Sequence, residues 1–263
     1  MLEWSINLFR IRGIQLSLHY SFVLLLAWAG YEGYQDGGIP GMGWTIALLL
    51  AFFTCIVLHE LGHSFTARRF GVGVRRILLM PIGGMAEFER IPREPRQEIL
   101  ITIAGPAVNF LIAGVLWLVL DPANAPPAQA VLPSSLSELG WILFSWNIYI
   151  GLFNLVPVFP MDGGRILRAL LAKRLPYVRA TFWAATVGKI LAGIGAVLAL
   201  LVFHNVLLAA LFAFIFMAGG LEYRAVRIRE QQDAYWETIR SRLQAAGIAP
   251  AASPSEPPLL GPN

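Results

Sequence analysis

FFTCIVLHELGH, at residues 52–63, is the stretch that decides the fold, because an uncharged and mostly apolar run over residues 44–58 leads directly into the pattern His-Glu-x-x-His. His59 and His63 lie four residues apart and would share one face of a helix, where both imidazoles can bind one Zn²⁺. Glu60 lies beside them and could activate a water molecule on that ion. Two buried core histidines are the alternative, which we disfavour because ionisable groups at membrane depth are costly and are functional by default.

The composition is that of a polytopic membrane protein. Charged residues make up only 14% of the 263 residues, against about 25% in soluble domains, and the mean hydropathy is +0.63. The formal net charge of +4 is expected to mark cytoplasmic loops beside a lipid bilayer, and not a nucleic-acid surface. The single cysteine, Cys55, cannot form an internal disulfide.

The apolar segments predict an all-α polytopic membrane protein with six transmembrane helices. We expect these helices at about residues 14–31, 44–70, 99–120, 139–155, 178–203 and 206–222. The loops after the second and fourth helices hold the basic clusters, whereas the loops after the first, third and fifth hold no Lys or Arg. The positive-inside rule therefore predicts a multi-pass protein of the cell (inner) membrane with both termini in the cytoplasm.

A small membrane-associated β-hairpin is predicted between the second and third helices. Residues 74–80 are rich in apolar and β-branched side chains, residues 81–84 (Pro-Ile-Gly-Gly) signal a turn, and residues 85–89 alternate. The apolar strand is expected to reach membrane depth. Extended backbone can do so only where protein buries it or where it lines a wet cavity.

A third metal ligand is needed, because a catalytic zinc takes three protein ligands and keeps one position for water. Cys55 lies one turn before His59, while Asp162 follows two prolines that end the fourth helix and precedes Gly163-Gly164. Each has an alternative role, Asp162 as a helix N-cap and Cys55 as a small buried thiol. Position 165 is Arg and not Glu, so no capping box supports the N-cap role.

The sequence resembles the site-2 protease family of intramembrane zinc metalloproteases over roughly residues 15–220. The resemblance rests on the His-Glu-x-x-His pattern, the Gly-Gly pair of the hairpin, Ala-Gly-Pro-Ala-Val-Asn at residues 104–109, and Asn-x-x-Pro-x-x-Pro-x-Asp-Gly at residues 154–163. The layout is similar to that of the compact prokaryotic six-span branch, because the tail is too short for a C-terminal CBS pair and no PDZ insertion is evident.

This resemblance implies a zinc metalloendopeptidase of regulated intramembrane proteolysis. Its substrates would be single-span membrane proteins, hydrolysed at a peptide bond within or near the transmembrane helix. One Zn²⁺ per chain would be held by His59, His63 and Asp162, so the resemblance favours Asp162 as the third ligand. Glu60 would be the catalytic residue that takes a proton from water and passes it to the leaving amine.

Substrate binding is expected at two places. Gly83 and Gly84 belong to the hairpin, which could hold an unwound substrate as an added strand. Asn154 could hydrogen-bond the substrate backbone or the oxyanion, and it could equally be an amide that packs helices together. Asn109 is interpreted as a packing residue, because Gly105 and Asn109 form a small-x-x-x-polar helix contact.

Three parts of the chain are expected. Residues 1–222 would form the six-span membrane protease domain, with a catalytic core at about residues 44–175. Residues 223–246 would form an amphipathic cytoplasmic helix, and residues 247–263 a disordered tail.

A zinc-binding membrane protein without proteolytic activity is the alternative function. A transporter would need ionisable groups on several spans and on both sides of the bilayer, yet the last two predicted spans offer only Lys189. An inactive binding partner would usually lack Glu60 or a ligand, and none is missing here. These two observations favour the protease.

Overall fold

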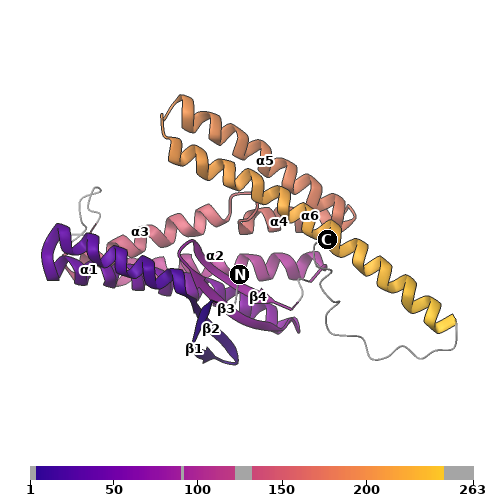
Figure 1. Cartoon of the computed structure of the whole chain (residues 1–263), viewed down its shortest axis with the longest axis horizontal. Coiled ribbons are helices and arrows are strands. Elements are labelled where there is room, and N and C mark those ends of the chain that lie inside the picture. Colours follow the sequence, from indigo (N-terminus) through magenta and orange to yellow (C-terminus); the bar gives the residue numbers. More distant parts are fainter. Residues whose placement is uncertain (1–3, 90–91, 122–131, 246–263) are drawn as a thin grey trace.

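The computed structural model describes residues 4–89, 92–121 and 132–245. Within these ranges the chain forms four strands and six helices, which Figure 1 shows in chain order. They are β1 (Ser5–Ile11), β2 (Ile14–His19), α1 (Tyr20–Arg69), β3 (Val74–Met80), β4 (Gly83–Phe88), α2 (Pro95–Val119), α3 (Leu136–Asn154), α4 (Asp162–Ala172), α5 (Tyr177–Leu201) and α6 (Val206–Ala245). The disordered tail predicted for residues 247–263 lies outside the described residues.

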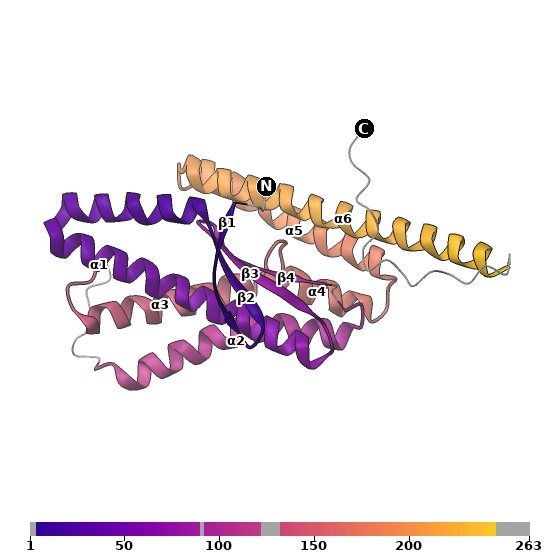
Figure 2. The same cartoon turned by 60° about the horizontal axis from the view of Figure 1, so that its bottom comes forward.

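Helix α1 folds back on itself in two halves. Gly37 and Gly38 have non-helical backbone angles, and Gly38 adopts a φ of +61° that glycine tolerates without strain. The halves run side by side after this break (Figure 2), so closely that a Cβ on Gly33 would lie 2.8 Å from the Gly41 carbonyl oxygen. The first two predicted helices correspond to these halves, and the loop expected between them is shorter than predicted because most of it is helical.

The predicted hairpin is present as β3 and β4, but it belongs to a larger sheet. Four strands lie in the order β1-β2-β3-β4. Strands β1 and β2 are antiparallel, β2 and β3 are parallel, and β3 and β4 are antiparallel. The predicted fold, in which the helices were accompanied by one two-stranded hairpin, therefore lacked β1 and β2. Strand β4 forms one outer edge of the sheet.

Strand β2 occupies residues that were predicted to begin the first transmembrane helix. The reason is visible in the sequence IQLSLH, where Ile14, Leu16 and Leu18 alternate with polar residues, which is the period of a strand. Arg12 and Gly13 take φ values of +48° and +87°, so they form a tight two-residue turn from β1. The helix then begins at Tyr20, after the side chain of His19 accepts a hydrogen bond from the Ser21 amide.

The sheet packs on α1 through one apolar cluster. This cluster joins side chains from β2, β3 and both halves of α1, namely Ile14, Leu16, Phe22, Phe53, Val57, Leu61, Ile77 and Leu79. Burial of apolar surface is the main stabilising contribution to such a contact. It fixes the sheet against the half of α1 that carries His59 and His63.

Five helices among the described residues are long and apolar enough to cross a membrane, namely α1, α2, α3, α5 and α6. Helices α2 and α3 pack beside α1, and α4 packs against both α2 and α5. Helices α5 and α6 lie side by side as a pair, and α6 extends well beyond α5 (Figure 1). The helix predicted for residues 223–246 is present over residues 223–245, where it continues α6 without a break, and residue 246 lies outside the described residues.

Candidate metal centre

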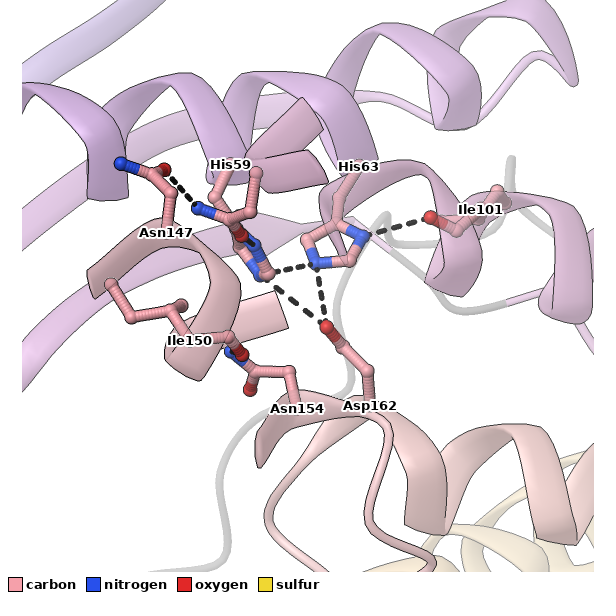
Figure 3. A network of polar contacts seen from close by, with 8 residues as sticks. His59, His63, Ile101, Asn147, Ile150, Asn154 and Asp162 are labelled. Carbon is pink, nitrogen blue, oxygen red and sulfur yellow. Dashed lines mark hydrogen bonds and ion pairs between the residues drawn. The ribbon is translucent and has the colours of Figure 1, made fainter. Parts of the chain in front are cut away.

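Three polar side chains from two distant parts of the chain meet in one buried cluster. His59 and His63 come from the second half of α1, and Asp162 is the first residue of α4. Asp162 Oδ2 lies 3.3 Å from His59 Nε2 and 3.2 Å from His63 Nε2, and the two Nε2 atoms are 3.0 Å apart (Figure 3). Each residue is less than a tenth exposed. The predicted ligand set is thus brought together in space.

The other ring nitrogen of each histidine is held by a hydrogen-bond acceptor. His63 Nδ1 lies 2.8 Å from the Ile101 carbonyl oxygen, and a carbonyl can only accept, so Nδ1 carries the hydrogen. His59 Nδ1 lies 2.6 Å from Asn109 Oδ1. A neutral imidazole that donates from Nδ1 has its lone pair on Nε2, and both Nε2 atoms face Asp162.

The donor set fits a zinc ion. Two imidazole lone pairs that face each other at 3.0 Å, next to a carboxylate, would repel one another unless a cation lies between them. Asp162 Oδ2 is buried and has no hydrogen-bond partner. The ligand atoms of the three residues all lie within 4.8 Å of one another, and imidazole and carboxylate are ordinary zinc ligands.

Asp162 does not cap its helix. The N-cap position of α4 is Met161, and no side chain makes a cap hydrogen bond there. The turn before α4 is tight, because a Cβ on Gly164 would lie 2.7 Å from the Phe159 amide nitrogen, and one on Gly163 would overlap the Val156 carbonyl oxygen. The two glycines therefore let the chain bring Asp162 to the histidines.

The charge of Asp162 suits a cation ligand. Asp162 is 8% exposed, and its Oδ2 has no hydrogen-bond partner among the described residues. A bound cation would offset the cost of burying its negative charge. An anionic oxygen beside two neutral imidazoles is the arrangement that a divalent metal neutralises.

Glycine lets α2 approach the histidines closely. A Cβ on Gly105 would lie 2.7 Å from His59 Nε2 and would overlap the ring of His63. A Cβ on Gly62 would likewise lie 2.7 Å from the Ala104 carbonyl oxygen. Any side chain at position 105 would occupy the space where the ligand atoms meet, so this position requires glycine.

Glu60 lies against the outer strand of the sheet. A Cβ on Gly84 would approach Glu60 Cγ to 2.9 Å and Ile56 Cγ2 to 3.0 Å, so β4 passes directly over this side of α1. Gly83, with a φ of +135°, begins β4 immediately after the hairpin turn. The structure therefore brings together two parts that the sequence assigned separately, the predicted catalytic carboxylate and the predicted substrate strand.

Asn154 is the last residue of α3 and lies beside Asp162 (Figure 3). Its side-chain amide donates to the Ile150 carbonyl oxygen at 3.1 Å. Asn154 as a substrate-binding residue stays a prediction. Cys55 is buried and accepts a hydrogen bond from Asn147, and it is not part of the ligand cluster among the described residues.

Several known proteins are similar to this chain in sequence or in structure. The model of peptidase family M50 matches residues 47–125 and 123–202. A zinc metalloprotease of Methanocaldococcus jannaschii is 38% identical over 247 residues, which cover 94% of this chain and 66% of the relative. The Rip3 protein of Mycobacterium tuberculosis is 33% identical over 234 residues, which cover 82% and 53%. The solved site-2 protease from M. jannaschii matches with a TM-score of 0.60 and 38% identity, over 84% of this chain and 95% of that one.

The chain therefore belongs to peptidase family M50, the family of the site-2 proteases, and the resemblance seen in the sequence is confirmed. Its apolar helices and its family make it a multi-pass membrane protein. This chain spans about two thirds of the length of the M. jannaschii relative and about half of the length of Rip3. Zinc, the metal in the name of the M. jannaschii relative, is the metal that the cluster of His59, His63 and Asp162 fits.

Proposed function

We propose that the protein is an intramembrane zinc metalloendopeptidase. His59, His63 and Asp162 hold one zinc ion, and Glu60 is the catalytic residue. The observation that carries this proposal is the convergence of three buried ligand atoms within 4.8 Å, next to the helix face of Glu60. The names of the relatives support the same activity.

The chemistry divides between the metal and the protein. Zinc, when bound, lowers the pKa of a coordinated water and polarises the scissile carbonyl. The Glu60 carboxylate accepts the proton of the attacking water and delivers it to the leaving amine. Asn154, at the end of α3, donates one N–H of its amide to the Ile150 carbonyl oxygen, and its second N–H could donate to the substrate backbone or to the oxyanion.

The substrates are single-span membrane proteins, cleaved within or near the transmembrane helix. A helical substrate hides its peptide groups in internal hydrogen bonds, so a protease must hold it extended. Strand β4 offers an outer edge beside Glu60, and an extended peptide can add to such an edge through main-chain hydrogen bonds. Gly83 and Gly84 begin β4, and Gly84 lies against Glu60, which supports these two glycines as substrate-binding positions.

The chain crosses the cell membrane six times, with both termini in the cytoplasm. Each half of α1 makes one crossing, and α2, α3, α5 and α6 make the others. His59 lies nine residues before Arg68, which places it about 14 Å in from the basic end of the helix. Residues 1–222 form the membrane domain, with the catalytic core at about residues 44–175.

One pair of variants tests this function. Glu60→Gln removes a proton carrier but no ligand, so we expect full zinc content and cleavage reduced by about 10²-fold or more. Asp162→Ala removes a ligand, so zinc and cleavage should be lost together. Purified protein would be measured for zinc by mass spectrometry and for cleavage of a model single-span substrate.

The outcomes separate the protease from its alternative. Full cleavage by Glu60→Gln would remove Glu60 from the mechanism. Wild-type protein that binds zinc but cleaves no single-span substrate, in detergent or in vesicles, would support a zinc-binding membrane protein without proteolytic activity. Full zinc content in Asp162→Ala would overturn the ligand set.

A further inference from the structure

Two fully buried asparagines connect three helices to the metal cluster. Asn147 on α3 and Asn109 on α2 are both 0% exposed. Asn109 Nδ2 lies 2.9 Å from Asn147 Oδ1, and Asn109 Oδ1 lies 2.6 Å from His59 Nδ1. Figure 3 shows Asn147 on the side of His59 opposite Asp162. The amides thus form a continuous chain of hydrogen bonds that ends at His59.

Which group donates and which accepts in this series of hydrogen bonds is fixed at the Asn147 end. Asn147 Nδ2 donates to the Leu143 carbonyl oxygen at 2.8 Å and to Cys55 Sγ at 3.3 Å. Because a carbonyl can only accept, Asn147 must turn its NH₂ group to Leu143 and its oxygen to Asn109. Asn109 must then donate to Asn147, which leaves its own oxygen facing His59.

We propose that Asn147 is a positioning residue that sets the tautomer of His59 and thereby its affinity for zinc. Asn109 alone could rotate its amide and present NH₂ to His59. His59 Nδ1 would then have to accept, and the hydrogen would move to Nε2, where the metal is bound. Asn147 prevents this rotation, because a rotated Asn109 would point its oxygen at the oxygen of Asn147.

The second histidine provides an internal comparison. His63 Nδ1 donates to the Ile101 carbonyl, which belongs to the backbone of α2 and cannot rotate. Its tautomer therefore needs no supporting side chain. His59 depends on two side chains in series, and removal of a hydrogen-bonding partner behind a ligand typically lowers metal affinity about 10- to 100-fold. The inference rests on the zinc site proposed above.

The test compares zinc affinity in a double-mutant cycle. Asn147→Leu keeps the approximate shape but frees the Asn109 amide, and we expect zinc affinity to fall at least about tenfold. Asn109→Asp offers His59 only acceptor oxygens, so the tautomer no longer depends on Asn147. In the Asn109→Asp background, Asn147→Leu should leave zinc affinity unchanged or raise it, because it removes an oxygen that faces the new carboxylate.

The measurement is a zinc titration of purified protein in detergent against a competing chelator, which does not depend on proteolysis. Thr181→Val is the matched control, because Thr181 is fully buried and its hydroxyl, within the part of the chain that the structure describes, donates to the Tyr177 carbonyl of its own helix. It should leave zinc affinity unchanged. If Asn147→Leu is not obtained as folded protein, Asn147→Ala makes the same comparison. Nitrogen NMR of histidine-labelled wild-type protein without zinc should show His59 protonated at Nδ1.

Three results would overturn the inference. The first is unchanged zinc affinity in Asn147→Leu. The second is an equal loss of zinc affinity when Asn147→Leu is made in the wild type and in Asn109→Asp, which would indicate an effect of packing alone. The third is a wild-type His59 protonated at Nε2. Wild-type protein that binds no zinc would instead contradict the metal site on which the inference rests. The two failures are therefore distinguishable.

Discussion

Arg168 on α4 is fully buried and makes ion pairs with two carboxylates. Its guanidinium lies 2.8 Å from Glu98 Oε1 on α2 and 2.7 Å from Glu222 Oε1 on α6. Arg168→Ala would leave Glu98, which is 2% exposed, as a buried charge without its partner. We expect a loss of about 3–5 kcal/mol in the free energy of unfolding, measured by denaturation in micelles.

Arg93 provides the matched control for that prediction. It also pairs with two carboxylates, Glu230 and Asp233, but its side chain is 49% exposed. Arg93→Ala should therefore change the free energy of unfolding by only about 0–1 kcal/mol. Similar losses in Arg93→Ala and Arg168→Ala would contradict the argument that burial decides the cost.

Among single residues, the sequence predicted those that belong to a recognisable motif. It did not predict those that meet only when distant parts of the chain pack together. The spacing of His59 and His63 predicted a shared helix face, and the turn chemistry together with the family resemblance pointed to Asp162. The sequence predicts Asn109 as a packing residue and does not single out Asn147, because their hydrogen-bond partners lie 50 and 38 residues away along the chain. A buried polar residue inside an apolar helix was the available signal, since such groups need partners.

Among the elements, β1 and β2 were missed because their signal is short. Hydropathy over a transmembrane-length window merges residues 14–19 with the apolar helix that follows them. Alternation over six residues predicts a strand, yet it identifies no partner, and each paired residue of β2 lies 61 positions before its partner in β3. The β3–β4 hairpin was predictable because its partners are adjacent in sequence.

Strand β4 is the element on which substrate recognition is proposed to depend. Alternate residues of a strand direct their N–H groups to opposite edges. Single prolines at residues 85–88 should therefore alternate in effect. A proline facing β3 should lower stability, whereas one facing the outer edge should reduce cleavage about tenfold or more with zinc content unchanged. Zinc content, thermal stability and cleavage of a model substrate would be measured for each variant.

Alanine at residues 85, 87 and 88 is the control for side-chain loss, because it keeps the backbone N–H. These variants should retain most of the wild-type cleavage unless the side chain itself binds substrate. Normal cleavage throughout a folded proline series would exclude main-chain pairing along β4.

For the whole molecule, α4 is the helix that joins the group formed by α1, α2 and α3 to the α5–α6 pair. It packs against α2 on one side and against α5 on the other, and α5 pairs with α6. Asp162 is at the beginning of α4, and Arg168 further along it links α2 and α6. The third proposed ligand is therefore contributed by the helix that packs against the α5–α6 pair.

The orientation of the molecule in the bilayer is the last prediction. Basic residues gather at the ends of the helices that carry the proposed site, and the turns near Gly38 and Asn205 carry no Lys or Arg. Positive charge is retained in the cytoplasm, so reporters inserted at Gly38 or Asn205 should be extracytoplasmic. Reporters inserted after Lys173 or Ala245 should be cytoplasmic.

Paired fusions to a phosphatase active only outside the cytoplasm and to a fluorescent protein that matures only inside it measure each position twice, and the two signals should be reciprocal. The reporter at Gly38 is the most informative test of the six crossings. The two halves of α1 each cross the membrane only if Gly38 and Lys173 lie on opposite sides of it. The same side for both would mean that α1 enters and leaves on one face, which would reduce the six crossings and remove His59 from the depth at which a transmembrane substrate is cleaved.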